Sequence, residues 1–137
     1  MKTMKKTGDQ HAPAGALRPM LADEEHGFAT IPIGSGWPSG LVLVATFAEA
    51  EGASVIALAA ILKGIGIAHQ AGWAKITIGA DSRLDDVGLS ARIATALAEK
   101  GISANIVAAY HRDHLFVPWD RRDEAMAILN ALSDPRE

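Results

Sequence analysis

The turn between Ala80 and Gly88 carries the residues best suited to binding a small polar molecule. It places Asp81, Asp85 and Asp86 directly ahead of a segment whose apolar spacing predicts a helix. Backbone N–H groups in the first turn of a helix lack internal partners and lie at the positive end of the helix dipole, so they can bind a carboxylate. The aspartates could hold an ammonium group, and Gly88 would let a ligand approach the backbone closely. This combination of groups suits a free amino acid.

The same residues could also have a purely structural role that needs no ligand. Asp85 or Asp86 could simply cap the helix, because aspartate accepts hydrogen bonds from the first helical N–H groups. Asn105, further along the chain, could tie the turn to a sheet, because asparagine favours turns on local grounds. Ligand binding and capping therefore stay open as alternatives for this turn.

Other clusters of polar residues predict less specific chemistry. His111, Asp113 and His114 surround a predicted hairpin tip and could converge on a metal ion, although histidines at such a tip are usually solvated. The charged run at residues 23–26 could form an acid/base cluster, but a run of this kind before a strand is more often a solvated lead-in. The sequence has no cysteine and shows no activated nucleophile or metal motif. We predict a protein that is not an enzyme and needs no cofactor or metal.

The composition indicates one compact domain, or two small lobes that share a core, within 137 residues. A hydrophobic fraction of 49% is enough for that core, whereas a formal net charge of -3 offers no basic field for nucleic acid. The longest apolar run, at residues 55–62, is too short to span a bilayer, and no apolar segment follows the first lysines as a signal peptide would require. We expect residues 1–20 to be a disordered tail on a cytoplasmic protein that binds neither nucleic acid nor membrane.

The second half of the chain has the hydrophobic pattern of a β-α-β-β-α unit. Residues 73–80 alternate apolar and polar positions as a half-buried strand does. Leucine and isoleucine then recur at helical spacing until Gly101, a glycine suited to a helix end. Strands at 103–110 and 114–117 predict a hairpin, and Asp120 is placed to cap a final helix. This order favours an α+β, ferredoxin-like fold in which helices cover one face of an antiparallel sheet.

The first half of the chain predicts an incomplete copy of the same unit. Its expected elements are three strands and a helix, at residues 27–33, 41–47, 53–58 and 59–72. Gly64 and Gly66 weaken the predicted helix by about 1 kcal/mol each relative to alanine. A strand-strand-helix string is what remains of the unit without its opening strand and helix, and the second half in turn lacks a closing strand. We infer that two intertwined or tandem halves complete one another, or that a neighbouring subunit completes them.

Three stretches of the chain resemble a known family. They are residues 86–105, which contain the phrase Leu97-Ala98-Glu99-Lys100-Gly101-Ile102-Ser103-Ala104-Asn105, residues 47–52 and residues 110–118. These stretches are similar to small bacterial ACT-domain proteins, related in fold to the ACT repeats of the CASTOR type and of aspartokinases. The resemblance implies a ferredoxin-like ACT fold, with an N-terminal ACT-like half at residues 21–72 and a C-terminal ACT domain at residues 73–137.

The resemblance also implies a ligand site and a function. The positions that match ligand-binding ACT domains are Asp81, Ser82, Leu84, Val87 and Gly88, with Asn105 on a following strand. ACT-like units commonly place ligand sites at an interface between two units, so a homodimer is implied. We predict a regulatory or sensor module that binds an amino acid or similar metabolite at this turn or interface. The alternative is a ligand-free module for protein-protein interaction through dimerisation.

Overall fold

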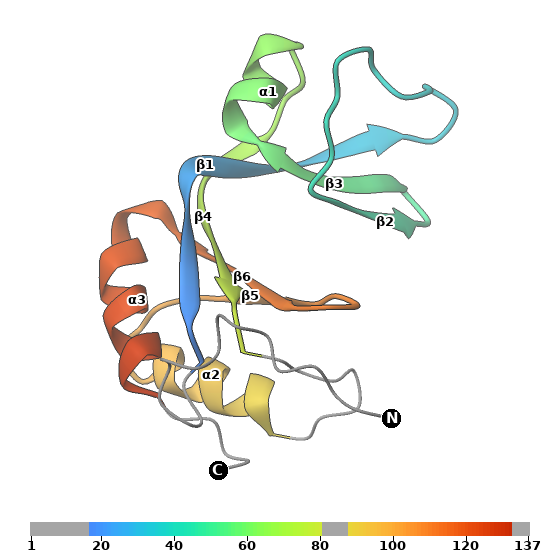
Figure 1. Ribbon diagram of the computed structural model, residues 1–137. Helices are drawn as coiled ribbons and strands as arrows, with labels where there is room; N and C mark the ends of the chain where they lie inside the picture. The colour runs from blue at the N-terminus through green and yellow to red at the C-terminus, as the bar shows by residue number, and fades with distance from the viewer. Residues whose placement is uncertain (1–16, 81–87, 133–137) are drawn as a thin grey trace, which may run out of the picture.

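A six-stranded antiparallel sheet with helices packed against it forms the protein (Figure 1). The computed structural model describes residues 17–80 and 88–132. In chain order the elements are β1 (Pro19–Pro32), β2 (Ala45–Glu49), β3 (Gly52–Leu58), α1 (Ala59–Gly64), β4 (Gln70–Ile78), α2 (Leu89–Ala98), β5 (Asn105–Ala108), β6 (Asp113–Pro118), the 3-10 helix η2 (Trp119–Arg121) and α3 (Arg122–Ala131). The strand order is β2-β3-β1-β4-β6-β5, with every neighbouring pair antiparallel. The predicted α+β, ferredoxin-like fold is confirmed.

One long strand, β1, belongs to both halves of the sheet. Its residues 19–28 pair with β4, and its residues 26–32 pair with β3 on the other side. The strands β1-β4-β6-β5 together with α2 and α3 make a complete ferredoxin-like unit, so β1 supplies the closing strand that the second half lacks. The closing strand of the second half therefore comes from the first half of the same chain and not from a neighbouring subunit.

β1 bends where it passes from one half to the other. Its pairing with β4 shifts register between Leu21 and Glu25 and again between His26 and Phe28, as at β-bulges. Opposite the second shift, Gly72 has φ +95°, and its N–H donates to the Glu25 carboxylate at 3.0 Å. Bulges bend a strand and increase its twist, so they turn the two ends of β1 in different directions. Figure 1 shows the result as two lobes, with β2, β3 and α1 in one and α2, α3, β5 and β6 in the other.

Regular structure begins earlier than the sequence pattern predicts. β1 starts at Pro19, whereas a strand was expected from residue 27, and Leu17 before it is only 1% exposed. The run at residues 23–26 is part of this strand, and its interpretation as a solvated lead-in is wrong for His26, which is 2% exposed. Asp23 and Glu24 remain exposed because they lie at the first register shift, where regular side-chain alternation is interrupted.

The first half does not contain the long helix predicted at residues 59–72. α1 ends at Gly64, and residues 65–69 connect it to β4. The Gly66 N–H donates to the Lys63 carbonyl and the Ile67 N–H donates to the Leu62 carbonyl, which is a Schellman motif with Gly66 at φ +75°. The helix stops here because glycine adopts this left-handed conformation at little cost.

The main core lies between the sheet and the helices α2 and α3. Its buried residues are Leu17, Ala74, Ile76, Ile78, Ala80, Leu89, Ile93, Leu97, Ile102, Leu115, Val117, Ala125 and Leu129. The apolar stripe predicted for α2 is among them. Leu17 and the partly buried Leu21 also belong to this cluster, so the beginning of β1 helps to fill the core of the second half. Burial of apolar surface thus adds to the hydrogen bonds that attach β1 to β4.

The helix end predicted at Gly101 is confirmed. The Gly101 N–H donates to the Ala98 carbonyl and the Ile102 N–H donates to the Leu97 carbonyl, as in the Schellman motif. Ile102 is only 3% exposed and lies in the same core cluster as Leu97, so the cap also contributes apolar contact.

The helix cap predicted at Asp120 is wrong. Asp120 lies inside η2, and Arg121 occupies the position before α3, where its side chain donates to the Glu124 carboxylate and does not cap the helix backbone. The guanidinium of Arg122 stacks on the Trp119 ring at 3.9 Å and donates to the Trp119 carbonyl at 2.6 Å. These contacts stabilise the extra turn that moves the start of α3 past Asp120.

We predict that a fragment of residues 73–137 does not fold, because it lacks β1 and exposes both an edge of β4 and the core that Leu17 covers. A fragment of residues 17–137 keeps β1 and should unfold cooperatively, with the same midpoint as the whole chain. Circular dichroism with urea denaturation of both fragments measures the difference. A monomeric, cooperatively unfolding fragment of residues 73–137 would show that β1 is dispensable.

Candidate functional site

Most of the turn predicted to bind a ligand lies outside the described residues. Asp81, Ser82, Leu84 and Val87 belong to that part of the chain, so their role stays a prediction. Gly88 precedes α2 with φ +97°, and a Cβ at this position would meet no described atom within 4 Å. Its backbone conformation, which other residues rarely adopt, therefore accounts for the glycine without a close approach to another group.

Asn105 lies apart from Gly88. It is the exposed first residue of β5 and pairs with Phe116 of β6. β6 separates β5 from β4 in the sheet. The ten residues of α2, about 15 Å in length, separate Gly88 from the chain that leads into β5. The structure does not bring these two predicted site residues together.

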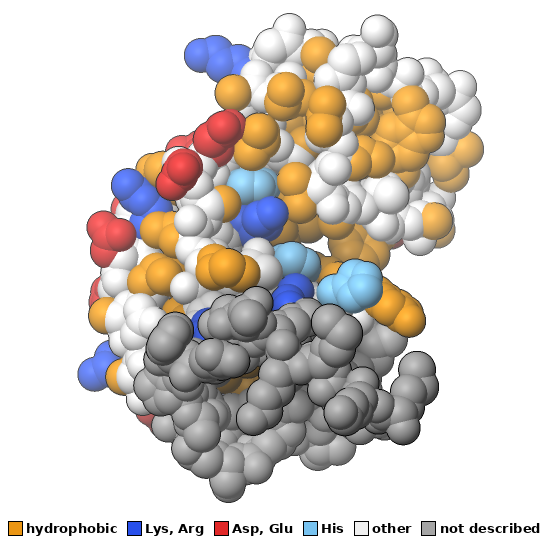
Figure 2. All heavy atoms as spheres, viewed as in Figure 1, with side chains coloured by type: hydrophobic (Ala, Val, Ile, Leu, Met, Phe, Trp, Pro, Cys, Tyr) orange, Lys and Arg blue, Asp and Glu red, His pale blue; other side chains and the backbone are white. Residues whose placement is uncertain are grey.

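The face of the sheet opposite α2 and α3 carries polar and aromatic side chains that were not predicted as a site. Side chains alternate along β4, so Lys75 and Thr77 point away from the core. Phe116 and His114 of β6 lie directly opposite these two residues, and His26 of β1 lies on the same face. Figure 2 shows histidine and Lys or Arg side chains close together in the hollow between the two lobes.

Lys75 lies near two histidines whose charged forms are disfavoured. Burial lowers the pKa of His26, and the charge of the nearby Lys75 lowers it further. The hydrogen bond from the Nδ1 of His26 to the Glu24 carbonyl raises the pKa and so opposes part of this shift. Burial and the charge of Lys75 also lower the pKa of His114, whose Nδ1 is 2.9 Å from the Thr77 hydroxyl oxygen. Lys75 forms no ion pair with any carboxylate in the described part of the chain. Among the described residues, the positive charge of Lys75 on this face therefore has no carboxylate partner.

Aromatic rings join β1, β4 and β6 on the same face. Phe28 packs edge-on against Trp73 and against Phe116, with ring centroids 5.5 Å apart in both pairs. His26 contacts Phe116 with a centroid distance of 5.9 Å. Edge-to-face pairs contribute about 0.5–1.5 kcal/mol each beyond their buried area. The cluster thus stabilises the sheet at the bend between the two lobes.

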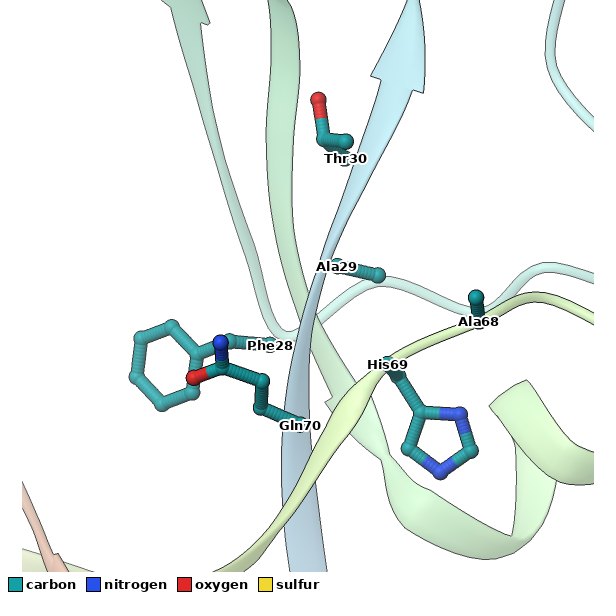
Figure 3. A pocket seen from close by; sticks show the side chains of 6 residues that line it. All are labelled: Phe28, Ala29, Thr30, Ala68, His69 and Gln70. Atoms are coloured by element: carbon teal, nitrogen blue, oxygen red, sulfur yellow. The ribbon is translucent and has the colours of Figure 1, made fainter.

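A cavity of about 510 Å³ lies where β1 and β4 diverge, beside this aromatic cluster. Its lining residues are Phe28, Ala29 and Thr30 of β1, with Ala68, His69 and Gln70 from the chain that enters β4. Figure 3 shows the side chains of Phe28 and Gln70 on one side of β1 and the ring of His69 on the other. The Nδ1–H of His69 donates to the Ile67 carbonyl at 2.7 Å, which holds the ring against its own loop. Its volume is within the range of small-molecule sites, and the cavity opens to solvent, because Thr30, Ala68 and Gln70 are exposed.

The described residues contain neither a metal-binding cluster nor a membrane segment. Within residues 17–80 and 88–132, no three histidine, aspartate or glutamate side chains are placed to hold a metal ion together. The hypothesis of a metal site at His111, Asp113 and His114 is therefore not supported. No helix in these ranges is long and apolar enough to cross a membrane.

The second half of the chain matches a known family, and more than four-fifths of the chain matches solved structures. A family model described as an ACT domain matches residues 68–131. A protein of unknown function from Vibrio cholerae, described as a possible transport protein, is 34% identical. The match covers 85% of this chain and 90% of that chain, with a TM-score of 0.75. The protein therefore belongs to the ACT-domain family, and the resemblance seen in the sequence is confirmed.

More distant structures share the fold. A protein from Agrobacterium tumefaciens is 18% identical, with 86% of this chain and 88% of that chain covered and a TM-score of 0.70. The ligand-free regulatory subunit of aspartate kinase from Thermus thermophilus is 13% identical, with 81% and 92% covered and a TM-score of 0.58. Two ACT-like halves joined through shared strands thus match the regulatory architecture of aspartate kinases in fold. Among functionally curated proteins, none matches the chain.

We predict that the free energy of unfolding falls between about pH 7.5 and about pH 5.5, because folded His26 and His114 bind protons less readily than the unfolded chain does. A lowered histidine pKa contributes stability that is complete above the ordinary value of 6.5 and is lost as the pH falls through the pKa of the folded state. Urea denaturation at both pH values measures the loss. The double variant His26→Gln, His114→Gln should lose less free energy of unfolding between the two pH values. A loss equal to that of the wild type would show that these two histidines do not cause it.

Proposed function

We propose that the protein is a non-catalytic regulatory module that binds an amino acid or a similar small metabolite between its two ACT-like halves. The observation that carries this proposal is the cavity at the divergence of β1 and β4, the two strands that join the halves. Its volume of about 510 Å³ has room for an amino acid. Its lining comes from β1 and from the chain that enters β4, and β1 is the strand that pairs with both halves.

The relatives support the regulatory part of the proposal. The Thermus thermophilus relative is a regulatory subunit, and it shares the fold over 81% of this chain. A module of this kind needs a ligand site whose occupancy affects more than one structural unit, and it needs no catalytic group. The turn at residues 80–88 is a second proposed place for ligand contact, with Asp81 and Gly88 as the residues to test there.

We predict that at least one of the twenty amino acids, tested singly at millimolar concentration, raises the melting temperature in differential scanning fluorimetry. A ligand that binds only the folded state stabilises it by mass action, by about 2.7 kcal/mol at a hundredfold excess over the dissociation constant. Isothermal titration calorimetry of the stabilising amino acid then gives its affinity and stoichiometry. If all twenty leave the melting temperature unchanged, the proposal fails and the interaction module described next is favoured.

A ligand-free dimerisation module is the second candidate function, because an apolar surface lies at one edge of the sheet. β2 is an edge strand in the described part of the chain, and it contains neither lysine nor proline, which commonly protect such edges. The large apolar side chains exposed on β2 and in the loop before it are Ile33, Trp37, Val42, Leu43, Val44 and Phe47. A second copy that paired its own β2 here would cover both edges and both apolar surfaces.

We predict a homodimer in light scattering, and we predict that Phe47→Glu converts it to a monomer. Phe47 is 47% exposed, and a glutamate at its position would bring two like charges together across a symmetric β2 pair. Met20→Glu is the matched control, because it places the same charge at a 53% exposed residue of β1, away from β2. A monomeric wild type would contradict the dimer, and a dimeric Phe47→Glu variant would place the interface elsewhere.

A further inference from the structure

The backbone of Thr30 points into the cavity between β1 and β4. The Ile56 carbonyl accepts a hydrogen bond from the Val44 N–H at 2.8 Å, so the backbone groups of Ile56 point toward β2. Phe28 pairs with Ile56 and must therefore direct its own N–H and C=O away from β3, toward β4. Backbone direction alternates along a strand, so the N–H and C=O of Thr30 point to the same side as those of Phe28.

β4 does not extend far enough to reach these groups. Its last pair with β1 is Phe28 with Gln70, and continued pairing would place Ala68 opposite Thr30. The Ile67 N–H is instead bonded to the end of α1, and the Ile67 carbonyl accepts from His69, so the chain before Gln70 leaves the sheet. No backbone hydrogen bond of the described chain continues β1 on this side beyond Phe28. The cavity thus occupies the place of a missing strand residue.

We propose that this place binds the main chain of a free L-amino acid, an inference that rests on the function proposed above. The ligand carboxylate accepts from the Thr30 N–H, and its ammonium donates to the Thr30 carbonyl. These are the two bonds that a residue opposite Thr30 would make in an antiparallel pair. The free amino acid therefore continues the pairing of Phe28 with Gln70 by one position.

The lining of the cavity fits a ligand with balanced charges. None of its six lining residues is Asp, Glu, Lys or Arg, so the site offers no fixed charge that would favour a purely anionic or cationic metabolite. A zwitterion brings its own balanced pair of charges and forms charge-assisted hydrogen bonds with the backbone. In the L form its side chain takes the side of the sheet on which Figure 3 shows Phe28 and Gln70, and the D form directs it toward His69.

Thr30→Pro tests the inference because it removes the N–H without removing any described hydrogen bond. Proline is tolerated in a strand where its nitrogen faces an open edge. Thr30→Val is the matched control, because it changes the side chain and keeps the N–H. Fluorimetry with each of the twenty L-amino acids should give the same shift for wild type and Thr30→Val. The shift should disappear in Thr30→Pro, whose dissociation constant in calorimetry should rise about tenfold or more.

A second measurement keeps the test decisive if Thr30→Pro does not fold. The α-hydroxy acid with the same side chain as the stabilising amino acid has a neutral hydroxyl in place of the ammonium donor, so it should stabilise the wild type less. The D enantiomer should bind at least tenfold more weakly, and so should the amino acid with an acetylated nitrogen and an amidated carboxylate, which represents a residue inside a peptide.

The outcomes separate this inference from the proposed function. If no amino acid shifts the wild type, both fail together. If one does, and Thr30→Pro or the α-hydroxy acid shows the same shift, the regulatory function stands and binding to the Thr30 backbone is wrong. If the capped amino acid binds as well as the free one, the site accepts a peptide strand and the inference of a free amino acid is overturned.

Discussion

The pairing of β1 with two different strands is the constraint on which the rest of the structure depends. A strand inside a sheet has to satisfy its N–H and C=O groups on both sides, and β1 does so with β3 on one side and β4 on the other. Removing either half therefore exposes an edge of the remaining half. The two ACT-like halves are consequently parts of one sheet, and Glu25, Gly72 and the ring of Phe28 stabilise the bend between them.

The same constraint explains the cavity. β3 follows β1 as far as Pro32, whereas β4 begins at Gln70 opposite Phe28, so the pairing ends at different residues on the two sides of β1. Proteins usually pair or cover such a half-open edge. Here the Schellman motif at Gly66 ends α1, and the chain after it does not pair with β1 before Gln70. A small molecule can bond to this edge without displacing any hydrogen bond of the described chain.

Side-chain periodicity predicts those elements of the fold that local pattern determines. α2 and its end at Gly101 follow from apolar spacing and one glycine, and both are observed. The beginning of β1 escapes prediction because a bulge lets Asp23 and Glu24 stay in water within a strand, which removes the alternation that identifies strands. The length of α1 is overestimated because a glycine inside a helix costs only about 1 kcal/mol, which does not exclude a helix through Gly66. In the structure Gly66 adopts a positive φ, and this ends the helix.

The candidate site is harder to predict because the groups proposed to bind the ligand belong to the backbone. Lys75 and the open face of the sheet follow from the alternation of residues 73–80 once these form a strand. Asn105 looks close to the predicted turn in sequence, yet β6 lies between its strand and β4, which only the sheet order reveals. The free N–H and C=O of Thr30 depend on where a strand more than thirty residues later begins, so no local pattern contains them. The lining of the cavity comes from β1 and from the chain that enters β4, and β1 pairs with strands of both halves, so the proposed place lies on the strand that the two halves share.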